Sequence, residues 1–324
     1  MHASSRLSRR SATVMAIVAG VTVLLAVFAG GAAAHDGRGD RHGSIGQDQI
    51  SIQLFNFLVP IIGGFPPPDP PLTTAQTQAN IRDAFATLHR IGYRQFENFG
   101  GTWGWSDAEY RKVFRSYKLQ AVGDHGSLDP ATFDARLDQA KTLGLKYVGS
   151  GGWPPPGNMD TLENALAIAK NLNEVGKKAG ARGLKVYGHN HDAEFRTKLP
   201  YDVNGDGVTE MVPAIEVVML NTDPRYVTFE IDVHWAYEGL GHEHFGDLVY
   251  FLHKYRNRIS ILHVKGTAAN GAITDVGTPS DITDWKSVFR AASKVDIYHF
   301  EYDLAPDPVA SAENGYRFLS RIRF

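Results

Sequence analysis

The segment YGHNHDAEF, residues 187–195, contains two histidines separated by one residue, followed by two carboxylates. Side chains of these types can hold a divalent metal, form an acid/base pair, or simply end a hydrogen-bonded strand. In a strand, His189 and His191 would point to the same side, so one could coordinate a metal while the other acts as a base or contacts substrate. Glu194 could replace either of them. The segment alone does not choose among these possibilities.

Three later apolar segments also end in imidazoles, carboxylates or a lysine. The residues are Glu230, Asp232 and His234 in VTFEIDVH, His263 and Lys265 in ISILHVK, and Glu301 and Asp303 in YHFEYD. Because alternate residues of a strand share one face, each segment can turn such a group towards a common centre. A ring of N and O ligands suits Mn, Co, Mg, Zn or Fe, and the alternative is a set of hydrogen-bonded strand ends. We predict that the metal ligands are His189, Asp232, His263 and Glu301.

The elements that must position these groups follow a regular alternation of strand and helix. Short β-rich segments are expected at residues 50–55, 94–99, 119–125, 146–152, 184–190, 227–232, 259–265 and 298–303. Segments of helical period lie between and after them, and Ser106 with Glu109 forms a capping-box signature at the start of one. Eight such repeats predict a single-domain (β/α)8 barrel over residues 50–324, whose active site lies at the C-terminal ends of the strands. No GxGxxG follows the first strand, which disfavours an open doubly wound sheet.

The N-terminus has the features of a secretory signal peptide. Arg6, Arg9 and Arg10 precede an apolar run at residues 12–28, and small residues end at Ala34. We predict a signal peptide over residues 1–34, export to the periplasm or the medium through it, and a flexible segment over 35–49. The paired arginines are also compatible with twin-arginine export, and a retained anchor is the less favoured alternative.

Composition excludes several classes of partner. The chain has 324 residues, and its 33 basic and 35 acidic residues leave a net charge of -2, which argues against nucleic acid as a partner. The chain contains no cysteine, so disulfides, thiolate ligands, a cysteine nucleophile and a lipoprotein anchor are excluded. No stable membrane association is expected after cleavage of the signal peptide.

Aromatic residues are concentrated in the predicted loops that follow strands. Trp103, Trp105, Trp153 and Trp235 all follow predicted strands, and His125 ends the third strand. Aromatic faces pack on the CH surfaces of sugars, so we predict these five as substrate-binding residues for a small sugar or sugar derivative. The alternative for the tryptophans is that they cap the barrel core.

The motifs GHNHDAEF, TDPRYVTFEIDVHWA, LHVKG, TDVG and HFEYD, in this order, resemble the sugar phosphate isomerase/epimerase family with its xylose-isomerase-like TIM barrel. The resemblance covers residues 50–324. It implies a metal held by ligands from strands five to eight at His189, Asp232, His263 and Glu301. Ketose epimerases of this kind use two metal-bound glutamates as bases, and here a histidine replaces the first. The resemblance to inosose dehydratases, whose fifth strand is also rich in histidine, keeps elimination chemistry open.

These features together predict an exported, divalent-metal-dependent sugar isomerase or epimerase that removes a proton next to a carbonyl. Glu301 is the expected base, His191 a second base or substrate contact, and Lys265 and His234 the electrostatic support for the oxyanion. The alternatives are a metal-dependent lyase or dehydratase acting on a keto-sugar or 3-keto-glycoside, and a non-catalytic carbohydrate-binding barrel. A phosphodiesterase of the endonuclease branch is disfavoured by the charge balance.

A separate motif, DVNGDGVTE at residues 202–210, resembles half of a calcium-binding loop. Asp202, Asn204, Asp206 and Gly207 match positions one, three, five and six of that loop, but position twelve is Pro213. The Asn-Gly and Asp-Gly pairs also predict a tight hairpin turn. Calcium binding is therefore a weak possibility beside the hairpin.

Overall fold

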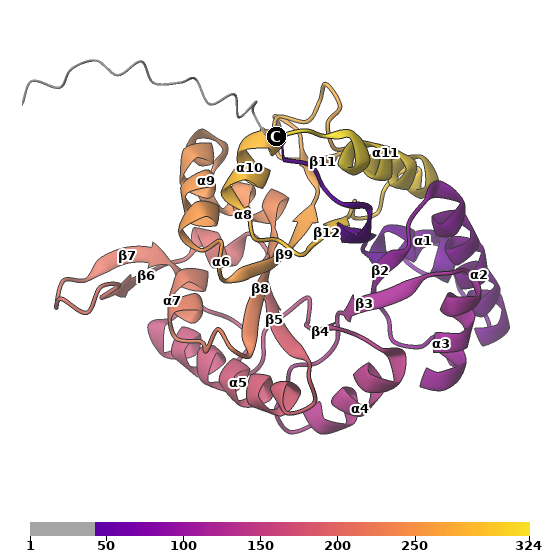
Figure 1. Ribbon diagram of the computed structural model, residues 1–324, viewed down its shortest axis with the longest axis horizontal. Helices are drawn as coiled ribbons and strands as arrows, with labels where there is room; N and C mark the ends of the chain where they lie inside the picture. Colours follow the sequence, from indigo (N-terminus) through magenta and orange to yellow (C-terminus); the bar gives the residue numbers. More distant parts are fainter. Residues whose placement is uncertain (1–42) are drawn as a thin grey trace, which may run out of the picture. The chain divides into compact units, whose positions relative to one another are not determined.

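The computed structural model describes residues 43–324, which form a ring of parallel strands surrounded by helices (Figure 1). Eight strands form the ring, and each overlaps a strand predicted from the sequence. They are β1 (Ile50–Ile52), β2 (Gln95–Asn98), β3 (Gln120–Asp124), β4 (Tyr147–Val148), β5 (Lys185–His189), β8 (Val227–Asp232), β9 (Ile259–Val264) and β12 (Ile297–Phe300).

Parallel pairing connects these strands in chain order. Six of them pair in the order β1-β12-β9-β8-β5-β4, and β2 pairs with β3. Single parallel bridges, Gln53 with Glu97 and His125 with Gly149, join the β2–β3 pair to the segments that follow β1 and β4. The curved six-stranded sheet and this pair therefore form the α/β barrel architecture that the alternation predicts.

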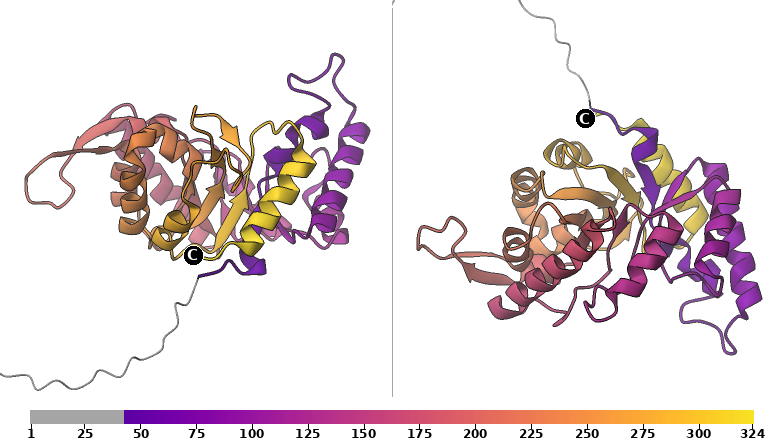
Figure 2. Two further views of the ribbon diagram at one scale, coloured as in Figure 1. Left: turned by 90° about the horizontal axis from the view of Figure 1, so that it is seen from above. Right: turned by 60° about the horizontal axis from the view of Figure 1, so that its bottom comes forward.

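Helices cover the outside of the strands (Figures 1 and 2). They are α1 (Leu58–Ile62), α2 (Thr74–Ile91), α3 (Asp107–Ser116), α4 (Phe133–Leu143), α5 (Leu162–Gly180), α6 (Ala193–Arg196), α7 (Ala214–Leu220), α8 (Val233–Leu240), α9 (Phe245–Lys254), α10 (Trp285–Ala291) and α11 (Pro308–Arg321). The predicted capping box is present at the start of α3. The Ser106 side chain accepts the backbone N–H of Glu109, and the Glu109 carboxylate accepts the backbone N–H of Ser106. α4 begins at Phe133, after a turn in which Asp129 accepts the backbone N–H groups of Ala131 and Thr132.

Two antiparallel hairpins are added to the barrel. β6 (Lys198–Tyr201) and β7 (Glu210–Pro213) form an arm that projects from the barrel (Figures 1 and 2), and β10 (Gly266–Thr267) pairs with β11 (Ile273–Thr274). In the arm, the Asp202 carboxylate accepts backbone N–H groups from Gly205 and Gly207 at 2.7 and 2.8 Å. The motif DVNGDGVTE thus forms the hairpin turn, and calcium binding there stays a prediction.

The described N-terminal residues are tied to the C-terminus. Phe324 N donates to Gly43 O at 3.0 Å, Ser44 bridges Arg323, and a short 3-10 helix spans Gln47–Gln49. These bonds involve Gly43 and Ser44 of the segment predicted to be flexible, and its flexibility stays a prediction. The predicted signal peptide and residues 35–42 lie outside the described residues. Across residues 43–324, no helix has both the length and the apolar character needed to span a membrane.

The inner face of the barrel carries a small apolar cluster of its own, made of Val122, Tyr147, Tyr187, Ile261 and Ile297. Tyr187 and Ile261 each lie two residues before a histidine of the same strand, so they share a face with those histidines. The cluster therefore closes the barrel beneath the polar side chains. A larger apolar core lies between the strands and the helices.

Gly149 allows Tyr187 to pack inside the barrel. A methyl group at Gly149 would lie 1.9 Å from a ring carbon of Tyr187, whereas a methyl group at Gly152 would meet no atom within 4 Å. We expect Gly149→Ala to lower the free energy of unfolding by about 1 to 3 kcal/mol through overpacking, and Gly152→Ala to change it by less than about 0.5 kcal/mol. Urea denaturation of both variants measures this, and equal effects would contradict the packing described.

Candidate active site

Four charged side chains meet at the C-terminal ends of β8, β9 and β12, and we call Asp232, His263, Lys265 and Glu301 the rim group. His263 Nδ1 lies 2.8 Å from Glu301 Oε2 and 3.8 Å from Asp232 Oδ2. Lys265 Nζ lies 3.0 Å from Asp232 Oδ2 and 2.9 Å from Glu301 Oε2. Strand register explains the meeting, because Asp232 on β8 is paired directly with His263 on β9. Three of the four predicted metal ligands are therefore neighbours.

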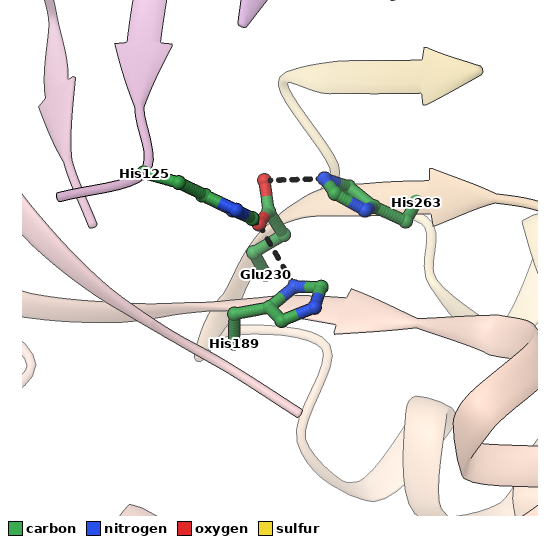
Figure 3. Close-up of side chains that lie close together, drawn as sticks. All are labelled: His125, His189, Glu230 and His263. Carbon is green, nitrogen blue, oxygen red and sulfur yellow. Dashed lines mark hydrogen bonds and ion pairs between the residues drawn. The ribbon is translucent and has the colours of Figure 1, made fainter. Parts of the chain in front are cut away.

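The fourth predicted ligand, His189, belongs to a second group that also includes His125, Glu230 and His263, and we call these four the inner group (Figure 3). Glu230 precedes Asp232 by two residues on β8. Its side chain therefore points to the same face of the strand but lies deeper in the barrel, further from the C-terminal rim. Its Oε2 lies 3.0 Å from His125 Nε2 and 3.0 Å from His189 Nδ1, and its Oε1 lies 3.2 Å from His263 Nε2. His263 thus belongs to both groups, with one ring nitrogen facing each.

A further buried carboxylate, Glu97 on β2, supports the inner group. Its Oε2 lies 3.0 Å from His263 Nε2 and accepts from Gln53 Nε2 at 2.5 Å, and its Oε1 accepts from the Tyr187 hydroxyl. Glu97 is fully buried. The sequence reading did not select it, although a carboxylate in the middle of the strand segment RQFENF was the available signal.

Charge pairing controls the protonation of the two groups. Burial lowers the pKa of His263, but the carboxylates of Glu230 and Glu301 outweigh burial and raise it well above its ordinary value. Burial likewise opposes ionisation of Glu301, and Lys265 and His263 outweigh it and lower the Glu301 pKa. By contrast, burial dominates at His189 and lowers its pKa to about 4. The carboxylates are therefore ionised and His189 is neutral at pH 7.

Asp303 lies next to the rim group, and its carboxyl is the one at this site whose pKa is close to neutral pH. Burial and the nearby Glu301 carboxylate raise the Asp303 pKa to about 7, although Lys265 Nζ lies 2.9 Å from its Oδ2. Lys265 itself is fully buried, and the three surrounding carboxylates raise its pKa despite that burial. The rim group therefore combines a permanent cation with ionised carboxylates.

A cavity of about 220 Å³ opens onto both groups. His125, His189, Lys265 and Glu301 contribute to its lining. Phe55 and Phe99, whose rings meet edge to face at 4.9 Å, form an apolar side that the sequence reading did not identify. His191 also lines the cavity but is exposed, because β5 ends at His189. Ionised, neutral and apolar surfaces thus face one small space, as a binding pocket for a polar organic molecule requires.

The four predicted substrate-binding tryptophans occupy different places. Trp153 is held by Glu194, which accepts its indole N–H at 2.8 Å, and the Trp235 ring lies 5.4 Å from Lys265 Nζ. Trp105 stacks on Tyr110 of α3, and Trp103 lines a separate cavity of about 340 Å³ beside the proline-rich loop after α1. None of the four tryptophans is part of the lining of the cavity that opens onto the two groups.

Two other predicted residues have structural partners. The second carboxylate oxygen of Glu194 accepts the backbone N–H of His191 at 2.8 Å, so Glu194 joins the loop after β4 to the end of β5. His234 Nδ1 lies 2.8 Å from the Thr267 hydroxyl, and its ring packs edge-on against Trp235 at 4.7 Å. Neither side chain lines the cavity.

Comparison with solved structures finds the same fold in several proteins. A sugar phosphate isomerase/epimerase from Parabacteroides distasonis has 20% sequence identity and a TM-score of 0.63, with 86% of this chain and 95% of that chain covered. The IOLI protein with a bound zinc atom has 14% identity and a TM-score of 0.55, with coverage of 84% and 95%. A probable 3-DHS dehydratase, AsbF, from Bacillus anthracis has 9% identity and a TM-score of 0.57, with coverage of 84% and 99%. No known family model and no curated protein matches the chain. The chain therefore has the xylose-isomerase-like TIM-barrel fold, as its motifs predict.

The Lys265 ammonium is the main positive charge that balances the carboxylates of the rim group. In metal-free protein, we expect Lys265→Met to lower the free energy of unfolding by about 3 kcal/mol or more, because it leaves buried carboxylates without a cation. The exposed pair of Lys146 and Asp296, 3.1 Å apart, provides the control. Lys146→Met should cost less than about 1 kcal/mol. Equal costs in chemical denaturation would show that Lys265 does not balance the rim group.

Proposed function

We propose that this protein is a divalent-metal-dependent enzyme that removes a proton next to the carbonyl of a sugar or sugar derivative. The observation that carries the proposal is the rim group, in which Asp232, His263 and Glu301 meet beside a small cavity with the Lys265 ammonium among them. The shared fold with an isomerase/epimerase and a dehydratase supports a carbohydrate-type substrate.

The rim residues suit a hard or borderline divalent cation. One imidazole and two carboxylates, all nearly or fully buried, provide the N and O donors that Mn, Co, Mg or Zn accept. When bound, such an ion would polarise the substrate carbonyl and stabilise negative charge on its oxygen. Nδ1 of His189 does not belong to this set of ligand atoms, because it faces Glu230.

The chain's own residues then divide the remaining work. Glu301 is ionised and lines the cavity, so it is the proposed base for the proton on the carbon next to the carbonyl. Lys265 contributes a fixed positive charge that favours the oxyanion. His191 lies on the open side of the cavity and is the proposed second proton donor or substrate contact. Phe55 and Phe99, which line the cavity, offer aromatic surface to the sugar ring.

Elimination is the second candidate. The motif resemblance implies that His189 replaces the first glutamate of a two-glutamate epimerase, which leaves Glu301 as the proposed single carboxylate base. Abstraction of the same proton followed by loss of a β substituent would make the protein a lyase, and the AsbF likeness supports this alternative. The product of the reaction separates the two candidates.

The charge of the cavity bears on the class of sugar. Its lining includes the Lys265 ammonium beside the carboxyl groups of Glu301 and Asp303. A phosphate would be repelled by these carboxylates, so we propose an unphosphorylated substrate such as a keto-sugar or 3-keto-glycoside. Such a substrate agrees with the proposed export of the protein through residues 1–34.

Hydrogen exchange tests the chemistry directly. Metal-loaded protein in heavy water should introduce deuterium next to the carbonyl of a keto-sugar, and Glu301→Gln should slow exchange by about 100-fold or more while substrate binding persists. Glu313→Gln, an exposed glutamate paired with Arg90, is the control and should leave exchange unchanged. Absence of exchange across a panel of keto-sugars would reject proton abstraction.

Metal content tests the cofactor. Elemental analysis of untagged protein purified without chelator should find divalent metal in at least near-stoichiometric amount. His263→Ala should lose it, because His263 supplies a ligand to the rim group, whereas the exposed His253→Ala should keep it. No metal after reconstitution with Mn, Co and Zn would instead favour a non-catalytic carbohydrate-binding barrel.

A further inference from the structure

We propose that the inner group, made of His125, His189, Glu230 and His263, binds a second divalent cation. One ligand atom from each residue lies within 4.8 Å of the other three, and all four side chains converge in Figure 3. Three imidazoles and one carboxylate form the donor set that four-coordinate zinc or cobalt accepts. This site does not depend on the reaction proposed above.

The buried negative charge around Glu230 favours a bound cation. Glu230 and Glu97 are both fully buried, and within residues 43–324 no lysine or arginine nitrogen lies within 4.0 Å of either carboxylate. The basic side chains that face them are imidazoles, and Glu97 also accepts from Gln53 and Tyr187, whereas Lys265 pairs with Asp232, Glu301 and Asp303. Two buried carboxylates balanced only by imidazoles carry a large desolvation penalty, which a divalent ion would offset.

Unpartnered polar atoms point into the same space. Within the described part of the chain, neither ring nitrogen of the fully buried His299 has a hydrogen-bond partner. Among the same residues, Oε1 of Glu230 also has no hydrogen bond, although His263 Nε2 lies 3.2 Å from it. His299 Nε2 lies 3.8 Å from that oxygen. Buried polar atoms are rarely left without a partner, because each costs about 1 to 3 kcal/mol. A cation bound at Glu230 would give this oxygen a partner and place His299 beside the ion.

The His263 ring would connect the two sites. Its Nδ1 faces the rim carboxylates, and its Nε2 faces Glu230 at 3.2 Å and Glu97 at 3.0 Å. Each nitrogen of an imidazole can bind one ion once its proton has left. Gln53 and the Tyr187 hydroxyl hold Glu97 from the other side, so the ring is fixed between the two groups.

The test uses the untagged full chain after removal of metal and titration with Co²⁺, followed by dialysis and elemental analysis. We expect about two ions per chain in the parent protein and about one in Glu230→Gln, with loss of the stronger visible absorption of a four-coordinate site. Asp232→Asn should lose the rim ion and keep the inner one. Glu216→Gln removes a buried carboxylate that bonds Lys254 and Tyr255, and should keep both ions.

The outcomes separate this site from the proposed function. A single ion that Asp232→Asn removes and Glu230→Gln retains would overturn the inner site and leave the rim site intact. Two ions without hydrogen exchange would support the inner site and reject the reaction. Copper-loaded protein gives an independent readout, because two ions on one imidazole couple magnetically and weaken the paramagnetic resonance signal. A full signal for two copper ions would overturn the bridge by His263.

Discussion

The polar interior of this barrel depends on the contacts that the buried imidazole of His263 makes with carboxylates. Its Nδ1 meets Glu301, and its Nε2 meets Glu97 and Glu230, so one ring lies between carboxylates from three other strands or strand ends. Carboxylates buried at this depth would repel one another and lose hydration without such a partner. The rise in the His263 pKa expresses the same balance, since its positive form is the one that the carboxylates favour.

The remainder of the fold holds the partners of His263 in place. Asp232 caps α8 by accepting from Trp235 N at 3.0 Å, and its own backbone N–H donates to the Asn190 side chain at 3.0 Å. These bonds use one Asp232 oxygen and leave Oδ2 for the rim. Glu97 is similarly fixed by Gln53 and Tyr187. The site is therefore supported by strand ends and helix starts rather than by long loops, which favours a defined geometry.

The likeness to solved structures establishes the fold, and the side chains carry the functional proposal. At 20% identity or less, the shared barrel does not transfer a substrate or a reaction. In this chain four histidines, His125, His189, His263 and His299, face the barrel interior. Together with Glu97 and Glu230 they extend the polar site below the rim, into a region that barrels commonly fill with branched apolar residues.

The sequence by itself determined the alternation of strands and helices, since periodicity and capping residues are local properties. It also indicated that Asp232, His263 and Glu301 end neighbouring strands, because parallel strands place their carboxyl ends at the same face. Only the tertiary structure decided which nitrogen of His263 faces which carboxylate, and that His189 faces Glu230. It also placed Trp103 and Trp105 away from the cavity. These choices depend on side-chain rotamers and on contacts across the barrel between residues far apart in the chain, which no local pattern records.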